Sequence, residues 1–248
     1  MREGLRQSGS DAESPRVTIA STDHFIGFLL IGVGVAALGF MAQHAPPADA
    51  AHAGQLAPHA QAVGVYLAAI CMDWALLYYC WIGVHRRGGT FEMLSGGRWR
   101  SARDLLTDLA IAIPFCVVSE AAAYGLTTVL GQNSARTVDS LLPGSLVEVL
   151  AWTATCVTAG VCEEIAFRGY VLCQLRAFTG STASAVVGQG LVFGLFHLYQ
   201  GWKNAVVISL LGVLYGLLAI WRGNLRANIL GHALTDFWEG WLKFLVWP

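Results

Sequence analysis

Charge is the scarcest property of this sequence. Only 12% of its 248 residues are Asp, Glu, Lys or Arg, and 55% are hydrophobic, whereas a soluble domain typically carries about 25% charged residues. A composition this poor in charge is typical of a protein whose main solvent is lipid. The net charge of -1 leaves no basic excess, so we expect no nucleic acid among its partners.

Paired cysteines and a cleavable N-terminal signal are also missing. The six cysteines lie inside or beside apolar runs without CxxC spacing, which indicates small core residues rather than a disulfide framework. The stretch Ala42-Gln43-His44-Ala45 lacks the A-x-A pattern of a cleavage site, so we expect residues 25–42 to stay as a first helix. The sequence also lacks an internal repeat of the kind that would indicate the two halves of a transporter.

Long apolar runs are what the sequence has in abundance. A bilayer core needs about 20 apolar residues per helix, and lipid cannot satisfy an unpaired backbone. The candidate spans are residues 25–42, 62–84, 104–130, 144–178, 183–199, 204–221 and 227–247. The fourth would be about 52 Å long as one straight helix, so it is tilted, protrudes, or is broken and contains an eighth helix. The predicted fold class is all-α, a polytopic transmembrane helical bundle of seven to eight helices.

Arginine placement predicts the orientation of the bundle, because cytoplasmic loops collect positive charge. With seven spans, twelve of the fifteen basic residues fall on one side: Arg2, Arg6, Arg16, Arg86, Arg87, Arg98, Arg100, Arg103, Arg168, Arg176, Arg222 and Arg226. Arg136, Lys203 and Lys243 fall on the other side. We therefore expect residues 1–23 to form a cytoplasmic tail and residues 24–248 a single transmembrane domain.

The first cluster of ionisable residues lies late in the fourth run, in Cys162-Glu163-Glu164-Ile165-Ala166-Phe167-Arg168. Charged groups at membrane depth are costly, so each is a functional candidate. On a helix, Glu164 and Arg168 are i,i+4 neighbours that can neutralise each other, while Glu163 points about 100° away from Glu164. This spacing leaves Glu163 free to act. The alternative is a buried charge cluster that only fixes helix packing.

A second cluster, Phe193-Gly194-Leu195-Phe196-His197, lies in the fifth run. A turn near Gly180 joins the fourth and fifth runs, and Glu163 and His197 each lie 17 residues from it. If both stretches are helical throughout, an antiparallel hairpin brings these two side chains to similar depth. Taken alone, His197 is better explained by an interhelical hydrogen bond.

A third cluster lies in the last run. His232 and Asp236 share one helix face by their i,i+4 spacing, and Asn228 extends that face by one turn. This pair also has a purely helix-stabilising alternative. Asp73 and Glu120 are further acids inside apolar runs, and for both we expect packing roles with satisfied partners.

At these three clusters the sequence resembles the CPBP family, which includes the eukaryotic CAAX prenyl endopeptidase and many bacterial relatives. The family motifs EExxxR, FxxxH and HxxxN or HxxxD occur here in order, within residues 162–236. The resemblance implies an intramembrane endopeptidase with a catalytic core at about 104–247, in the bacterial inner (plasma) membrane. It implies a membrane-anchored protein or peptide as substrate, for CAAX-type processing or peptide maturation.

Residue by residue, the resemblance makes Glu163 the catalytic acid that activates water, with His197 assisting. His232 and Asp236 occupy the positions that stabilise the oxyanion or orient the water. Structural support falls to the remaining motif and neighbouring positions, Glu164, Arg168, Phe193 and Asn228. One departure matters: better-studied members carry Asn where this chain has Asp236, and an ionised Asp cannot donate a hydrogen bond to an oxyanion. Asp236 is therefore expected to orient His232 or to bind a cation.

Peptide hydrolysis itself needs a base for water, a proton carrier for the leaving amine and a donor for the oxyanion. Two carboxylates with two histidines also suit an open Zn²⁺ site, whose ligands would be Glu163, His197, His232 and Asp236. We favour the mechanism without a metal. Two other classes stay open: a non-proteolytic scaffold or bacteriocin-immunity protein with the same fold, and a cation or proton transporter.

Overall fold

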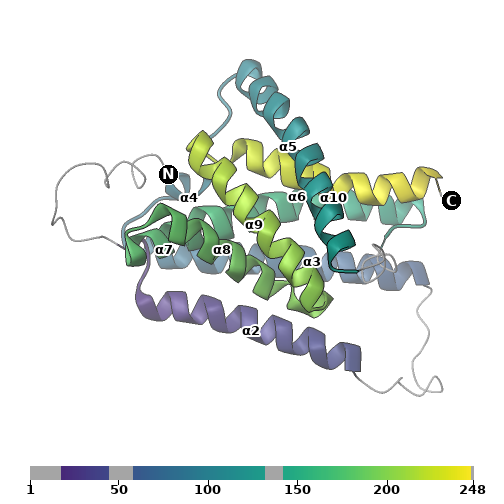
Figure 1. Cartoon of the computed structure of the whole chain (residues 1–248), viewed down its shortest axis with the longest axis horizontal. Helices are drawn as coiled ribbons and strands as arrows, with labels where there is room; N and C mark the ends of the chain where they lie inside the picture. Colours follow the sequence, from purple (N-terminus) through teal and green to yellow (C-terminus); the bar gives the residue numbers. More distant parts are fainter. Residues whose placement is uncertain (1–17, 45–57, 132–141, 247–248) are drawn as a thin grey trace.

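A computed structural model describes residues 18–44, 58–131 and 142–246 of the chain (Figure 1). Every regular element in these ranges is helical, which confirms the all-α bundle. The long helices are α2 (Thr22–His44), α3 (Pro58–His85), α5 (Ala102–Val129), α6 (Leu146–Glu163), α8 (Thr182–Phe196), α9 (Trp202–Arg222) and α10 (Arg226–Val246). The shorter ones are α4 (Phe91–Ser95), the π-helical η2 (Glu164–Val171), α7 (Leu172–Thr179) and the 3-10 turn η3 (Leu198–Gln200). Residues 1–17 of the expected tail lie outside the described part, as does Arg136.

Helix length and hydropathy support a multi-pass membrane protein. Among the residues that the structure describes, four stretches are long and apolar enough to cross a bilayer, Ala62–His85, Ala102–Val129, Leu146–Thr179 and Trp202–Arg222, and Thr22–Leu38 and Thr182–Phe196 are apolar but shorter. Large apolar side chains point outward on α5, where Val117 is 64% and Val129 82% exposed, as expected for a surface that meets lipid rather than water.

The fourth predicted run is one continuous helical path whose type changes along its length. The α6 helix passes directly into η2 at Glu164, and α7 continues from Leu172 to Thr179. All eight residues of η2 are buried. The helix ends at Gly180, whose φ of 68° is readily adopted only by glycine. The run is therefore not broken into two separate helices but contains a π-helical segment, a type of irregularity that is frequent at functional sites.

Close contacts between helix backbones set the depth at which the motif residues meet. A Cβ atom on Gly160 would lie 2.8 Å from the carbonyl oxygen of Ile229, so α6 and α10 approach at backbone distance. A Cβ on Gly190 would lie 2.7 Å from the carbonyl oxygen of Ser209, which brings α8 equally close to α9. Glycines thus hold the helices that carry all three clusters against their neighbours.

The basic residues of the loops gather at one end of the bundle. Asp108 of α5 is fully buried there and pairs with Arg222 and Arg226 of the α9–α10 turn, at 2.8 Å in both cases. Trp99 donates its indole N–H to the same carboxylate. This ion-pair network fixes α5 to the last two helices.

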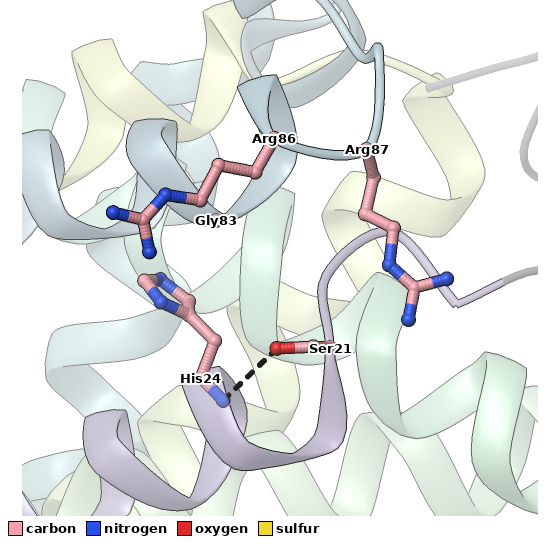
Figure 2. Close-up of a pocket in the computed structure, with 5 residues that line it drawn as sticks. All are labelled: Ser21, His24, Gly83, Arg86 and Arg87. Carbon is pink, nitrogen blue, oxygen red and sulfur yellow. Dashed lines mark hydrogen bonds between the residues drawn. The ribbon is translucent and has the colours of Figure 1, made fainter.

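A second joint, between α2 and α3, also involves basic residues. The ring of His24 stacks on Tyr79 with centroids 4.0 Å apart, and each side chain hydrogen-bonds the other residue's carbonyl oxygen. Figure 2 shows a small cavity of about 60 Å³ at this joint, lined by Ser21, His24, Gly83, Arg86 and Arg87. None of the residues from the three sequence clusters lines it.

Candidate active site

The centre of the site is the carboxylate of Glu164, which is fully buried at the start of η2. Arg168 places its Nη1 atom 3.0 Å from Glu164 Oε1, forming the i,i+4 ion pair that the spacing predicts. His232 Nδ1 bonds the same oxygen at 2.8 Å. Asn228 donates to the other oxygen at 3.1 Å. One carboxylate thus ties η2 to two successive turns of α10.

Glu163 has a different environment from its neighbour. Its side chain is 17% exposed, whereas that of Glu164 has no exposed surface. Its Oε2 atom lies 3.7 Å from His232 Nε2, and Asp236 Oδ2 lies 3.6 Å from that nitrogen. His232 therefore bonds Glu164 through Nδ1, and its Nε2 faces the partly exposed carboxylates of Glu163 and Asp236.

The hydrogen bonds of the two histidines fix which nitrogen is free. A carbonyl or carboxylate oxygen only accepts, so the nitrogen bonded to it must carry the proton. His232 therefore donates from Nδ1 to Glu164, and His197 donates from Nδ1 to the Phe193 carbonyl at 2.9 Å. In each neutral ring Nε2 is then unprotonated and available to accept a proton.

His197 itself lies at the end of α8 rather than inside a helix. The predicted span 183–199 is wrong at this end, because α8 stops at Phe196 and residues 198–200 form η3. The imidazole of His197 donates a hydrogen bond to the Phe193 carbonyl oxygen. In a continuing α-helix, this oxygen would accept from the backbone N–H of His197 instead. His197 lies within electrostatic range of Glu163, although it stands outside the helix that the hairpin prediction assumed.

Aromatic rings enclose the buried cation of the site. The guanidinium of Arg168 lies 4.3 Å from the Phe193 ring centroid and 5.2 Å from that of Tyr215. Phe193 also contacts the rings of His197 and His232, at centroid distances of 4.7 and 6.2 Å. Phe193 is therefore the common wall between Arg168 and both histidines.

Two residues beyond the three clusters reach the same place. Asp73 of α3 lies within electrostatic range of His232 and Asp236, and Tyr199 of η3 within range of Glu163, Asp73 and Asp236. The sequence did draw attention to Asp73 as an acid in an apolar run, but its expected packing partner is absent from the hydrogen bonds and ion pairs of the described residues. Tyr199 carried no signal beyond its position two residues after His197.

Glu163, His197, His232 and Asp236 are the ligands that the metal-dependent alternative would use. Among the residues that the structure describes, no group of three or more His, Cys, Asp or Glu side chains is arranged to hold a metal ion. Nδ1 of His197 and of His232 is bonded to a protein oxygen, which leaves Nε2 as the nitrogen with which either ring could bind a metal ion. What the arrangement offers instead is a carboxylate with access to water, two proton-accepting nitrogens and a second carboxylate.

A comparison with protein families identifies the segment that carries this site. Residues 145–238 match a family model described as Type II CAAX prenyl endopeptidase Rce1-like. The match confirms the resemblance to the CPBP family over a segment that contains all of the motif residues, and it supports an endopeptidase in general terms. No curated protein and no solved structure matched the chain.

Proposed function

We propose that this chain, which carries an Rce1-like segment at residues 145–238, is an intramembrane endopeptidase that hydrolyses a peptide bond of a membrane-associated protein or peptide. The unequal environment of two adjacent acids carries this proposal. Glu164 is fully buried in an ion pair with Arg168, and Glu163 keeps part of its side chain exposed beside His232. A general base needs access to water and a nearby proton carrier, and Glu163 meets both conditions.

In the proposed reaction Glu163 takes a proton from water while the water oxygen bonds to the substrate carbonyl carbon. The carbonyl oxygen becomes the oxyanion of a tetrahedral intermediate. When the C–N bond breaks, the proton held by Glu163, directly or through Nε2 of His197, moves to the leaving nitrogen. The products are a carboxylate-ended fragment and an amine-ended fragment, and the enzyme returns to its starting state.

His232 and Asp236 would position the groups that take part in this reaction. Glu164 fixes the ring of His232 through Nδ1, so Nε2 points to Glu163 and Asp236. Asp236 Oδ2 lies 3.6 Å from that nitrogen, so its charge attracts the ring when His232 is protonated and keeps it oriented. Asp236 thereby takes the orienting role that its ionised carboxylate allows.

We further propose that the substrate is membrane-anchored, processed in the CAAX manner or as a maturing peptide, in the inner (plasma) membrane with a cytoplasmic N-terminus. The concentration of loop arginines at one end of the bundle, in Arg86, Arg87, Arg222 and Arg226 among others, supports this orientation. The catalytic core would cover about residues 104–247.

The test uses the purified full-length protein in detergent with a library of membrane-anchored peptides, read by mass spectrometry. Glu163→Gln is expected to lower the cleavage rate by about 10²- to 10⁴-fold while leaving the unfolding midpoint close to that of the wild type. The matched control is Glu92→Gln, because Glu92 is an exposed acid of α4; this variant should cleave at the wild-type rate.

Two results would contradict the proposal. A folded Glu163→Gln protein that cleaves at the wild-type rate would remove Glu163 from the chemistry. No cleavage of any peptide, with the cellular phenotype intact in Glu163→Gln, would favour the scaffold or immunity protein. A chelator series on the active wild type distinguishes the metal-dependent route, since only that route loses cleavage with the metal and regains it with Zn²⁺.

A further inference from the structure

The position of Tyr199 is the first feature that goes beyond the family motifs. It lies in η3, two residues after His197, and its ring is within 27° of parallel to that of His197 with centroids 6.1 Å apart. Its phenol lies within electrostatic range of Glu163 and Asp236. The early end of α8 is what brings Tyr199 here, because a helix continued to residue 199 would turn its side chain about 200° away from that of His197.

The hydroxyl of Tyr199 has a free proton. Gln200 donates from Nε2 to the Tyr199 oxygen at 3.1 Å, so the oxygen acts as an acceptor in that bond. No acceptor for the hydroxyl proton lies among the described residues. A phenol stays protonated at neutral pH, so this side chain is a neutral donor at the edge of a cluster of carboxylates.

Among its motif residues, the proposed reaction has one candidate for such a donor, Nε2 of a protonated His232, and the carboxylates of Glu163 and Asp236 already face that nitrogen. Asp236 stands where the motif has Asn in other members, and its carboxylate accepts hydrogen bonds but cannot give one. His232 donates from Nε2 only while it is protonated. An oxyanion needs a donor aimed at it throughout the reaction, and removal of one such donor typically lowers kcat by about 10²- to 10³-fold.

We propose that Tyr199 is the oxyanion donor of the reaction proposed above. Its O–H gives a hydrogen bond to the substrate oxygen as charge develops, the part that an Asn amide at position 236 would take. This inference rests on the proposed endopeptidase function. It makes Tyr199 a catalytic residue and explains how the site works with Asp236.

The test compares kcat and KM of four proteins on one cleaved peptide. Tyr199→Phe is expected to lower kcat by about 100-fold with little change in KM. Adding Asp236→Asn to Tyr199→Phe should restore at least about tenfold of the loss, since the amide supplies a new donor. Tyr124→Phe is the control, because Tyr124 is 68% exposed on α5 and should leave kcat unchanged.

Tyr199→Phe with kcat within twofold of the wild type would overturn this inference. So would a loss of kcat that Asp236→Asn does not reverse, since that pattern belongs to a structural role. Glu163→Gln in the same assay distinguishes a failure of the proposed endopeptidase mechanism from a failure of the role assigned to Tyr199. If Glu163→Gln cleaves normally, the endopeptidase mechanism fails, whereas a dead Glu163→Gln beside a fully active Tyr199→Phe leaves only the tyrosine assignment wrong.

A second, independent observation concerns the inner face of α3. Tyr66 and Leu77 are buried on this face, and Asp73 lies seven residues after the first and four before the second, so all three share one side of the helix. Tyr66 packs its ring against Trp152 of α6 at 5.5 Å, and Leu77 shares a core cluster with Cys162. Asp73 is therefore directed at α6 near the Cys162–Glu163 pair.

Asp73 is also without the partner that an intramembrane acid normally has. It is half-buried, and within the described residues no hydrogen bond or ion pair satisfies its carboxylate. A carboxylate at this depth without a partner lowers stability. An intramembrane acid without such a partner is a candidate for a role in the chemistry.

We infer that Asp73 is a positioning residue that acts through Glu163 and His232. Its negative charge favours a proton staying on this pair between the attack of water and the departure of the amine. The site would then be completed by a helix outside residues 145–238, the segment that the family match covers. This inference also rests on the proposed function.

The role of Asp73 is tested by measuring kcat and the unfolding midpoint of its variants separately. Asp73→Asn is expected to lower kcat by at least about tenfold, and Asp73→Leu to do the same while the unfolding midpoint stays equal or rises, because the unpaired acid is gone. Glu92→Gln again serves as the control. A normal kcat in Asp73→Asn would overturn the inference, as would a lowered midpoint in Asp73→Leu with kcat per folded molecule unchanged.

Discussion

At the scale of single residues, Glu164 shows how one buried carboxylate organises a site. Its two oxygens accept hydrogen bonds from His232 and Asn228 of α10, and Oε1 also forms an ion pair with Arg168 of η2. The two hydrogen bonds give partners to polar groups inside the bundle, and the ion pair neutralises a buried charge. The residue that reacts in our proposal, Glu163, is next in the chain and owes its geometry to these contacts.

We therefore expect Glu164→Gln to act on stability before chemistry. The amide removes the charge that neutralises Arg168 and loses one acceptor, and breaking a buried ion pair typically costs about 3–5 kcal/mol. The measurement is the unfolding midpoint in mild detergent, compared with Glu163→Gln, which should change it little. A midpoint for Glu164→Gln equal to that of the wild type would contradict the role assigned to this carboxylate.

The sequence predicted part of this residue-scale arrangement. The pairing of Glu164 with Arg168 follows from i,i+4 spacing, because both residues lie on one helix. The hydrogen bond from His232 to Glu164 joins residues 68 positions apart, and helix periodicity carries no information on such a contact. The i,i+4 spacing also predicted that His232 and Asp236 lie on one helix face, and Asp236 Oδ2 lies 3.6 Å from His232 Nε2.

At the scale of helices, Gly160 decides how closely α6 and α10 approach. A Cβ at this position would lie 2.8 Å from the Ile229 carbonyl oxygen and 3.0 Å from the Ala233 amide nitrogen. Both are backbone atoms that cannot turn aside. Gly160 lies one turn before Glu163, and Ile229 and Ala233 lie on either side of His232 in the sequence, so this contact sets the distance between the two halves of the site.

Gly160→Ala is expected to push these helices apart, lowering the unfolding midpoint and reducing cleavage by at least about tenfold, since small displacements at a catalytic site are costly. Gly125→Ala on α5 is the matched control, because a Cβ there meets nothing within 4 Å. The control should raise stability by about 1 kcal/mol through helix propensity. Equal behaviour of the two variants would show that this helix contact does not govern the site.

At the scale of the whole molecule, the buried Asp108 joins parts that are distant in the sequence. It pairs with Arg222 and Arg226 and accepts from Trp99, so α5, the α9–α10 turn and the segment after α4 meet at one carboxylate. The same end of the bundle carries the α2–α3 joint with its two arginines (Figure 2). These contacts close the end of the bundle to which the loop arginines belong.

Asp108→Asn should weaken the contacts at this end of the bundle without changing the candidate active site. Two partly buried arginines would lose their counter-charge, for which about 3–5 kcal/mol is a typical loss, and the unfolding midpoint in detergent should fall accordingly. The comparison is Arg98→Gln, which removes an ion pair with Glu92 whose side chains are 87% and 68% exposed and should leave the midpoint unchanged. An unchanged midpoint in Asp108→Asn would contradict the network's structural role.

The sequence by itself determined the helical bundle, the approximate spans and the motif residues. Each of these follows from local properties: apolar runs must become helices in lipid, and i,i+4 spacing puts residues on one face. The one clear error, the end of the span at 183–199, arose because a side chain, His197, replaces the backbone in bonding Phe193. A hydropathy pattern carries no information on whether a side chain or a backbone N–H bonds a given carbonyl oxygen.

Only the tertiary structure decided which residues meet. The exposed Glu163 beside a buried Glu164, the Nδ1 bond of His232 to Glu164, and the approach of Asp73 and Tyr199 all depend on contacts between separate helices. Such contacts depend on where glycines allow backbones to touch and on which buried polar groups find partners. Both are properties of the packed chain, and no single segment of the sequence contains them.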